Sequence, residues 1–252
     1  MSAKFKTRLD QLMVDQGLAP DLKSAAALVM AGKVLVEREK RSPTPGMLIR
    51  LEAHADVKII PSQRFVSRGG WKLHKALGLF DVDVDGAVCL DLGASTGGFT
   101  DCLLQAGARR VYALDTGRGQ LHYKLRNDDR VVNMERRNLS DGIGLPENID
   151  VLVADVSFNS LANVLPAALK QLVDGGLAIV LLKPQFEAKK SEVPRGGVIS
   201  DPVTHAKVIG RFVKWATNMK IRVRNFTTSG IRGDKGNIEF LLQLELPHLR
   251  IQ

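Results

Sequence analysis

A glycine-rich turn is the first part of the sequence with the chemistry to hold a small ligand. It reads Asp91-Leu-Gly93-Ala-Ser-Thr-Gly97-Gly98-Phe-Thr and directly follows the apolar segment 87–92. A strand, a turn of this kind and a helix form the place where α/β proteins hold nucleotides. A dinucleotide fingerprint needs glycine where this chain has Ser95, and a P-loop needs a Gly-Lys-Ser/Thr sequence that is missing here. The turn predicts a nucleotide site but leaves the ligand open, and a plain strand–helix turn stays an alternative.

Alternating strands and helices after residue 80 are expected to position this turn. Apolar runs bounded by helical segments are typical of strands that are buried on both faces of a parallel sheet. We therefore expect a doubly wound, mostly parallel, Rossmann-like α/β fold that ends in an antiparallel pair. The expected strands are 87–92, 110–115, 131–135, 150–155, 176–183, 221–227 and 237–245, and the expected helices are 99–106, 161–172 and 202–219.

A different pattern occupies the first 60 residues. Apolar residues recur at helical spacing, and Gly17 and Gly32 stand where helices end. We expect helices over 7–17 and 21–32 and short strands over 33–37, 47–51 and 56–60, which make a small αα-β domain of residues 1–60. Residues 61–80 are then a basic linker and the start of the second domain, and 81–252 form the rest of that domain.

The composition excludes several classes of protein. The longest apolar stretch, residues 177–182, is far shorter than the roughly 20 residues of a membrane span, and the start MSAKFKTRLD lacks the apolar core of a signal peptide. The two cysteines, Cys89 and Cys102, exclude a disulfide scaffold and a cysteine-based zinc site. The five histidines have no metal-ligand spacing. We expect a globular cytoplasmic protein without a metal or a membrane partner.

The charge is positive and unevenly distributed. Lys and Arg exceed Asp and Glu by nine in 252 residues, which favours a polyanionic partner. Residues 61–80 carry a net charge of +4 and residues 181–236 a net charge of +8, so the rest of the chain is slightly acidic. If the two segments meet in space, they form a phosphate-binding face. Simple solubility is the alternative explanation.

The N-terminal pattern resembles the S4 RNA-binding domain. The match rests on Arg8-Leu-Asp, Leu12, Gly17, Ser24, Ala27, Gly32, Val34, Val36 and Gly46, and it departs from the family at Lys23-Ser24-Ala25, where these domains often have Ser-Arg. The resemblance implies RNA binding, for which the candidates are Arg8, Lys23, Lys33, Arg64 and Arg68. A module that only docks on its neighbour is the alternative.

The glycine turn resembles motif I of class I S-adenosylmethionine-dependent methyltransferases. That resemblance implies a cofactor loop of Asp91, Gly93, Ser95, Gly97, Gly98 and Phe99. It also implies that Asp115, at the end of the second strand, accepts hydrogen bonds from the ribose hydroxyls of S-adenosylmethionine. Asp155 at the end of the fourth strand is expected near the methionine end, and Asn138 near the adenine.

Three further motifs resemble the FtsJ-like 2′-O-methyltransferases, and specifically the TlyA family of hemolysin-like rRNA methyltransferases. They are Ser67-Arg-Gly-Gly-Trp-Lys72-Leu, Lys183-Pro-Gln-Phe-Glu187 and Gly236-Asn-Ile-Glu239-Phe. The family's catalytic Lys-Asp-Lys-Glu set corresponds here to Lys72, Asp155, Lys183 and Glu239. The resemblance implies methylation of cytidine 2′-hydroxyls in ribosomal RNA, with rRNA or ribosomal subunits as partners and a monomer favoured.

The chemistry asks for such a set. A ribose 2′-hydroxyl is a poor nucleophile, so its proton must be removed or its developing oxyanion stabilised. Lys183 is the candidate base, because a partly desolvated lysine beside a second ammonium, here Lys72, gives up its proton more readily. Asp155 and Glu239 would hold the two lysines. Ordinary surface ion pairs are the alternative for each, as is core packing for Trp71 and Phe186, whose rings are otherwise suited to stacking on a base.

Three other functions remain open at this stage. The family name suggests a hemolysin, although no segment is long or amphipathic enough to insert into a membrane. An rRNA-binding assembly factor without catalysis is a second alternative, and a methyltransferase of small molecules is a third.

Overall fold

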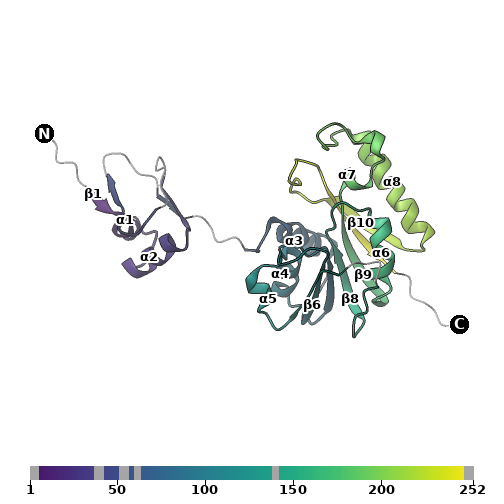
Figure 1. The fold of residues 1–252 in the computed structure, drawn as a ribbon, viewed down its shortest axis with the longest axis horizontal. Coiled ribbons are helices and arrows are strands. Elements are labelled where there is room, and N and C mark those ends of the chain that lie inside the picture. Colours follow the sequence, from purple (N-terminus) through teal and green to yellow (C-terminus); the bar gives the residue numbers. More distant parts are fainter. Residues whose placement is uncertain (1–5, 37–42, 51–56, 60–63, 138–141, 247–252) are drawn as a thin grey trace. The chain divides into compact units, whose positions relative to one another are not determined.

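The computed structural model describes residues 6–36, 43–50, 57–59, 64–137 and 142–246 (Figure 1). The chain divides into two compact units, residues 1–64 and 65–252. Each unit has its own hydrophobic core, and each is described by itself below.

The N-terminal unit packs two short helices against two small antiparallel strand pairs. Its elements are β1 (Lys6–Arg8), α1 (Leu9–Asp15), α2 (Leu22–Met30), β2 (Val34–Val36), β3 (Leu48–Arg50) and β4 (Val57–Ile59). Strand β1 pairs with β3, and β2 pairs with β4. The helix expected from residue 7 begins only at Leu9, because Thr7 and Arg8 hydrogen-bond to β3 instead. Gly17 and Gly32 follow the two helices with positive φ, as predicted.

The second unit is built on a seven-stranded sheet with the order β10-β11-β9-β8-β5-β6-β7. Strands β5 to β9 run parallel, while β11 is antiparallel to both β9 and β10. The predicted doubly wound, mostly parallel α/β fold is therefore confirmed. The strands are β5 (Val88–Leu92), β6 (Arg110–Asp115), β7 (Val131–Glu135), β8 (Ile149–Ala154), β9 (Leu172–Leu182), β10 (Arg222–Thr228) and β11 (Phe240–Glu245).

Helices cover both faces of this sheet. Alternate strand residues point to opposite faces, so Val151 and Val153 belong to one core cluster and Leu152 and Ala154 to the other. On one face lie α3 (Arg68–Phe80), α4 (Gly98–Gln105) and α5 (Tyr123–Arg126), and on the other lie α6 (Leu161–Leu169) and α8 (Pro202–Asn218) (Figure 1). The short α7 (Pro184–Glu187) and a 3-10 turn, Lys190–Glu192, follow β9.

Helix α3 occupies most of residues 61–80, which were expected to be a basic linker and the start of the following domain. Leu73, Ala76, Leu77 and Phe80 have the i, i+3, i+4, i+7 spacing of an amphipathic helix, and all four are buried. Their burial against α4 outweighs the two glycines in the first turn. Residues 65–80 thus belong to the second unit, and the buried face of α3 contributes to its core.

The expected helix 161–172 is also too long. Helix α6 ends at Leu169, and Leu172 already begins β9, where it pairs with Ile149 of β8. Leu172, which the apolar pattern alone assigns to the helix, therefore pairs in the sheet.

Candidate active site

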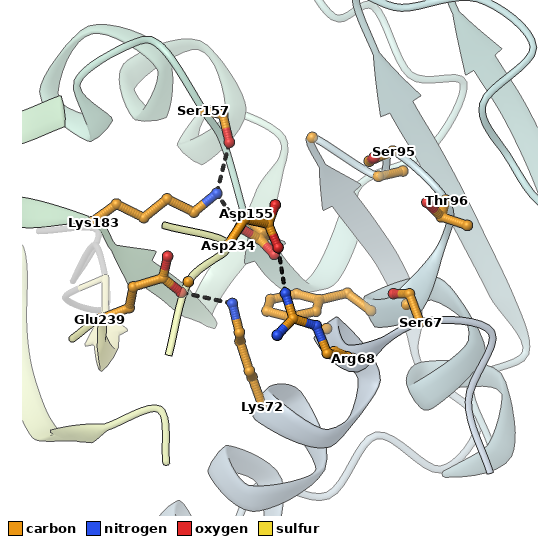
Figure 2. A pocket seen from close by; sticks show the side chains of 16 residues that line it. Ser67, Arg68, Lys72, Ser95, Thr96, Asp155, Ser157, Lys183, Asp234 and Glu239 are labelled. Atoms are coloured by element: carbon orange, nitrogen blue, oxygen red, sulfur yellow. Dashed lines mark hydrogen bonds and ion pairs between the residues drawn. The ribbon is translucent and has the colours of Figure 1, made fainter. Parts of the chain in front are cut away.

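A polar cavity of about 280 Å³ opens at the carboxyl ends of β5 and β8 (Figure 2). Five parts of the chain line it: the start of α3, the glycine-rich turn, the loop after β8, the loop after β9, and the loop between β10 and β11. The lining residues are Ser67, Arg68, Gly69, Lys72, Gly93, Ala94, Ser95, Thr96, Gly98, Phe99, Asp155, Ser157, Lys183, Gly233, Asp234 and Glu239.

Sheet topology explains why distant residues meet here. Lys183 directly follows β9, and Asp155 directly follows the parallel neighbour β8. Strand β11 runs in the opposite direction, with Phe240 opposite Leu182, so Glu239 lies at the same edge as Lys183. All four residues of the predicted Lys-Asp-Lys-Glu set line the one cavity.

The glycine-rich turn passes close to the backbone beneath and beside it. Gly93 has φ of 84°, and a Cβ there would lie 2.9 Å from the carbonyl oxygen of Asp155. A Cβ on Gly98 would collide with the Ser67 hydroxyl at the start of α3. The glycines therefore bring the backbone of the turn close to the neighbouring segments, and the short side chains of Ala94, Ser95 and Thr96 line the cavity beside them.

Asp115 holds this turn in place through two hydrogen bonds. One of its carboxylate oxygens accepts a hydrogen bond from the Ser95 amide at 2.8 Å, and the other accepts one from the Gly117 amide at 2.6 Å. Each oxygen retains a further lone pair for a ligand hydroxyl. The position of Asp115 at the end of β6 thus fits the expected ribose contact, which stays a prediction.

Asp91, predicted to belong to the cofactor loop, does not line the cavity. Its side chain is fully buried, and burial raises its pKa to about 7. One carboxylate oxygen accepts hydrogen bonds from the Thr100 amide at 2.8 Å and the Thr100 hydroxyl at 2.6 Å. Asp91 therefore fixes the first turn of α4, and its burial prevents direct contact with a ligand in the cavity.

The Lys183 ammonium has two polar partners at the cavity wall. Its Nζ lies 2.6 Å from an oxygen of Asp155 and donates a hydrogen bond to the Ser157 hydroxyl at 2.7 Å (Figure 2). The Lys183 side chain is 11% exposed and that of Asp155 is 22% exposed. A lysine ammonium has three donors, so one direction at Nζ remains for a ligand.

Lys72 and Glu239 form a second, drier pair. Lys72 Nζ donates to a Glu239 oxygen at 2.6 Å, joining α3 to the residue before β11. The two side chains are 10% and 3% exposed. A Cβ on Gly233 would collide with the Glu239 carboxylate, so this loop closes directly over the pair.

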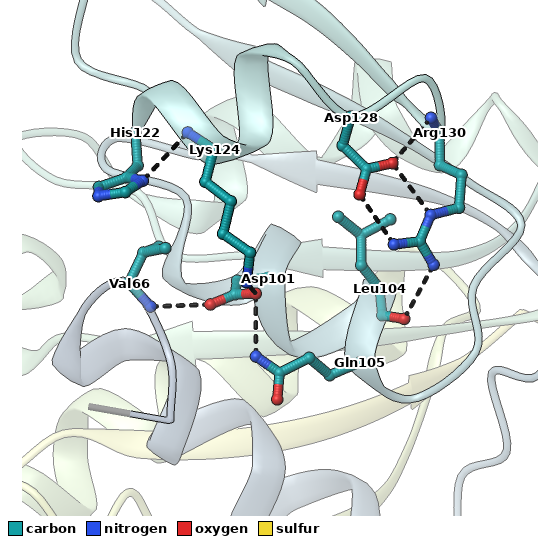
Figure 3. A network of polar contacts seen from close by, with 8 residues as sticks. All are labelled: Val66, Asp101, Leu104, Gln105, His122, Lys124, Asp128 and Arg130. Atoms are coloured by element: carbon teal, nitrogen blue, oxygen red, sulfur yellow. Dashed lines mark hydrogen bonds and ion pairs between the residues drawn. The ribbon is translucent and has the colours of Figure 1, made fainter. Parts of the chain in front are cut away.

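The two basic segments meet around these lysines. Arg68 forms an exposed ion pair with Asp234, and Lys75 donates to the Thr228 carbonyl oxygen at 2.7 Å. The start of α3 is anchored independently, since the Val66 amide donates to buried Asp101 of α4 at 2.8 Å (Figure 3). These contacts hold the start of α3 at the cavity.

The remaining RNA-binding candidates lie in the N-terminal unit. Lys23 and Lys33 are exposed, and so is Arg64. The Arg8 guanidinium donates to Asp10 at 2.6 and 3.0 Å, and this pair lowers the pKa of Asp10.

Asn138, predicted near the adenine, lies outside the described residues. Gly97 carries the positive φ before α4 but does not line the cavity.

Sequence reasoning missed several lining residues and one neighbouring aromatic. Ser67, Thr96, Ser157 and Asp234 line the cavity, and the sequence motifs gave none of these four residues a role of its own. Phe158 is 91% exposed, and its ring centre lies 5.2 Å from that of Phe186. Its position three residues after Asp155 was the only available signal.

The chain matches a family described as FtsJ-like methyltransferase over residues 65–246. It belongs to that family. The predicted family, and with it an S-adenosylmethionine-dependent methyltransferase, is confirmed. The match covers the whole sheet and every residue that lines the cavity.

Relatives extend the similarity to nearly the whole chain. Hemolysin A of Brachyspira hyodysenteriae is 39% identical, covering 93% of this chain and 98% of the relative. The 16S/23S rRNA (cytidine-2′-O)-methyltransferase TlyA of Mycobacterium tuberculosis is also 39% identical, covering 95% and 90%. A solved structure described as a hemolysin from Streptococcus thermophilus has 40% identity and a TM-score of 0.70, covering 99% of this chain and 92% of that one.

The described residues offer no candidate for a membrane span or for a metal site. Within the described residues, no helix combines the length and hydrophobicity that crossing a bilayer requires. The same residues contain no group of three or more His, Cys, Asp or Glu side chains arranged to hold a metal ion.

Proposed function

We propose that this protein methylates ribose 2′-hydroxyls of ribosomal RNA, and that cytidine is the target nucleoside. The observation that carries the proposal is the Lys183 ammonium, held by Asp155 and Ser157 in the same cavity as the glycine-rich turn. The relative from M. tuberculosis, whose name specifies this reaction, supports the choice of nucleoside and RNA.

S-adenosylmethionine, when bound along the turn, supplies an electrophilic methyl group on a positively charged sulfur. The chain's own residues then have to deal with the hydroxyl proton. With two directions at Nζ used by Asp155 and Ser157, the third is left for the 2′-oxygen. Lys183 can act as a base only after its ammonium has released one proton to solvent, and the lone pair of the neutral amine then accepts the hydroxyl proton as the 2′-oxygen attacks.

Lys72 has a supporting role in this scheme. Glu239 neutralises its charge, and both side chains are almost fully buried. The pair places no free positive charge beside the sulfonium, which would otherwise repel it. It also joins α3 to the edge of β11, and so keeps the start of α3 beside the glycine-rich turn.

We also infer that the N-terminal unit is an S4-like RNA-binding domain. Lys23 and Lys33 are exposed there, and the unit has the helix pair and short strands of the S4 pattern. Phosphate contacts by such side chains supply affinity without sequence specificity. The rRNA partner and the cytoplasmic location remain part of this proposal.

Methyl transfer to purified rRNA tests the proposed function. Full-length protein with labelled S-adenosylmethionine should label rRNA or a ribosomal subunit, and nuclease digestion with mass spectrometry should place the methyl on a cytidine ribose. RNA binding should weaken steeply as salt rises. A methyl found on a base would refute 2′-O transfer, and rRNA binding without any transfer would favour the non-catalytic assembly factor.

A further inference from the structure

Glu187 ends the Lys183-Pro-Gln-Phe-Glu187 motif but does not line the cavity. It is the last residue of α7, and its half-buried side chain turns toward the loop after β8. One carboxylate oxygen accepts a hydrogen bond from the Leu161 amide at 2.6 Å, and the other accepts one from the Ser160 hydroxyl at 2.7 Å. Both carboxylate oxygens are therefore used by one short segment of chain.

That segment is the start of helix α6. Ser160 is the N-cap, and its hydroxyl accepts a hydrogen bond from the Ala162 amide at 3.2 Å. Helix N-termini have amides without intrahelical partners and favour negative charge. Glu187 thus adds a second cap to α6 from outside the helix, and in doing so it ties α7 to the end of the loop 155–160.

The same loop carries the partners of Lys183. Asp155 and Ser157 contact the Lys183 ammonium, and the exposed ring of Phe158 lies against Phe186. Phe158 has φ of 63°, a conformation that a residue with a side chain adopts only when its surroundings hold it there. Contacts from Lys183, Phe186 and Glu187 therefore fasten the loop to the 183–187 segment at three successive places.

Burial of the Glu187 carboxyl group lowers what this residue can contribute to the stability of the fold. Desolvation is the main cause that raises its pKa, and the hydrogen bonds from Leu161 and Ser160, with a smaller contribution from Arg211 of α8, oppose the shift only in part. An acid whose pKa is raised by folding stabilises the protein below its unfolded pKa and loses that contribution as pH rises. The raised pKa of Glu187 therefore means that ionising its carboxyl group in the fold costs stability as pH rises.

We propose that Glu187 is a positioning residue for catalysis: by capping α6 it fixes the loop 155–160 so that Asp155 and Ser157 meet the Lys183 ammonium. It acts through these residues and does not touch the substrate. The proposal rests on the proposed function, because the reaction it supports is methyl transfer by Lys183.

Kinetics of the full-length Glu187→Ala variant test this role. Misplacing the loop by about 1 Å should lower kcat on the order of a hundred-fold. KM for S-adenosylmethionine should stay within about threefold of wild type, since Glu187 does not contact the glycine-rich turn. Glu187→Gln should recover most of kcat, because its amide can accept from the Leu161 amide and donate to Ser160.

Glu192→Ala is the matched control. Glu192 is a half-buried acid five residues further along, and it pairs with Arg211 at 2.7 Å without contacting the loop 155–160. Its kcat should equal that of wild type. Amide hydrogen exchange over 157–161 should accelerate in Glu187→Ala but not in Glu192→Ala.

Each result separates the two proposals. Wild-type protein that transfers no methyl to rRNA refutes the proposed function, whatever Glu187 does. A Glu187→Ala variant with wild-type kcat, or with unchanged exchange over 157–161, overturns the positioning role. Parallel loss of kcat and cofactor affinity in both Glu187 variants also overturns it, because that result indicates a general loss of structure.

Discussion

The two lysine–carboxylate pairs of the cavity have the same chemistry and very different surroundings. Both join an ammonium to a carboxylate oxygen at 2.6 Å. Glu239 is 3% exposed and meets Lys72 across 167 residues of chain, whereas Asp155 is 22% exposed and shares Lys183 with the Ser157 hydroxyl. All four residues line the cavity and the two lysines are almost equally buried, at 10% and 11% exposed, so the pairs differ in their carboxylates: Glu239 is enclosed and Asp155 is the more accessible. Lys72 with Glu239 is therefore called the closed pair, and Lys183 with Asp155 the open pair.

The difference in burial between the two carboxylates decides which pair can more easily move a proton. A buried pair balances a large desolvation cost against attraction, so removing one partner leaves a charge with neither water nor counter-ion. A partly exposed pair is screened and can lose or exchange a partner at a lower cost. We therefore assign proton transfer to Lys183 and a largely structural, charge-neutralising role to Lys72 and Glu239.

The largest expected effect comes from changing the open pair. Lys183→Ala should lower the rate of methyl transfer by about a hundred- to ten-thousand-fold, because the acceptor of the 2′-hydroxyl proton is lost. Calorimetry should show unchanged binding of S-adenosylmethionine. Lys183→Arg should be similarly slow, since arginine keeps the charge but does not give up its proton at accessible pH.

Single-turnover measurement of the arginine variant is the decisive comparison. Rates near those of wild type would show that Lys183 stabilises charge without acting as a base. The proton would then pass to water or to Asp155, and the contrast between the two pairs would concern electrostatics alone.

The open pair was predictable from sequence because it depends on short-range features. Lys183 and Asp155 directly follow apolar runs, and parallel strands bring their carboxyl ends to one edge of a sheet. Strands 110–115 and 131–135 were predicted with their observed bounds for the same reason. Hydrophobic periodicity and the ends of strands are local signals, and both can be recognised in the sequence without knowledge of the packing.

The rest of the site depends on packing, which no local pattern encodes. Ser157 and Glu187 gain their roles only because the loops after β8 and β9 touch. The start of α3 looked like a linker, since Gly69 and Gly70 disfavour helix, but the close approach of Phe65 to Gly70 leaves no room for a larger residue. Asp91 was expected in the cofactor loop, and only the structure shows that its carboxylate is buried against Thr100 and does not line the cavity.

A change at the closed pair should mainly affect stability. Glu239→Gln leaves the Lys72 ammonium buried without a counter-charge, which typically costs about 3–5 kcal/mol of unfolding free energy. Asp155→Asn should cost clearly less, because the Lys183 ammonium has the Ser157 hydroxyl and lies at an open cavity. Urea unfolding of the two variants measures the difference directly.

A double variant controls for the loss of shape at the closed pair. Replacing both partners, with Lys72→Met and Glu239→Leu together, should recover most of the stability that Glu239→Gln loses, because no unpaired charge remains. Equal destabilisation by Glu239→Gln and Asp155→Asn would contradict the contrast in burial on which the two roles rest.

The smallest effect is expected at a third pair, Arg68 with Asp234, which extends the comparison to full exposure. Their side chains are 60% and 93% exposed, so water and salt screen the attraction, and Asp234→Asn should leave the melting temperature almost unchanged. The variant should instead bind rRNA about two- to threefold more tightly, since Arg68 no longer divides its charge between Asp234 and a phosphate. Adding Arg68→Gln should cancel that gain. If Asp234→Asn tightens RNA binding equally with and without Arg68, the gain reflects net charge alone, and the exposed pair has no specific role at the mouth of the cavity.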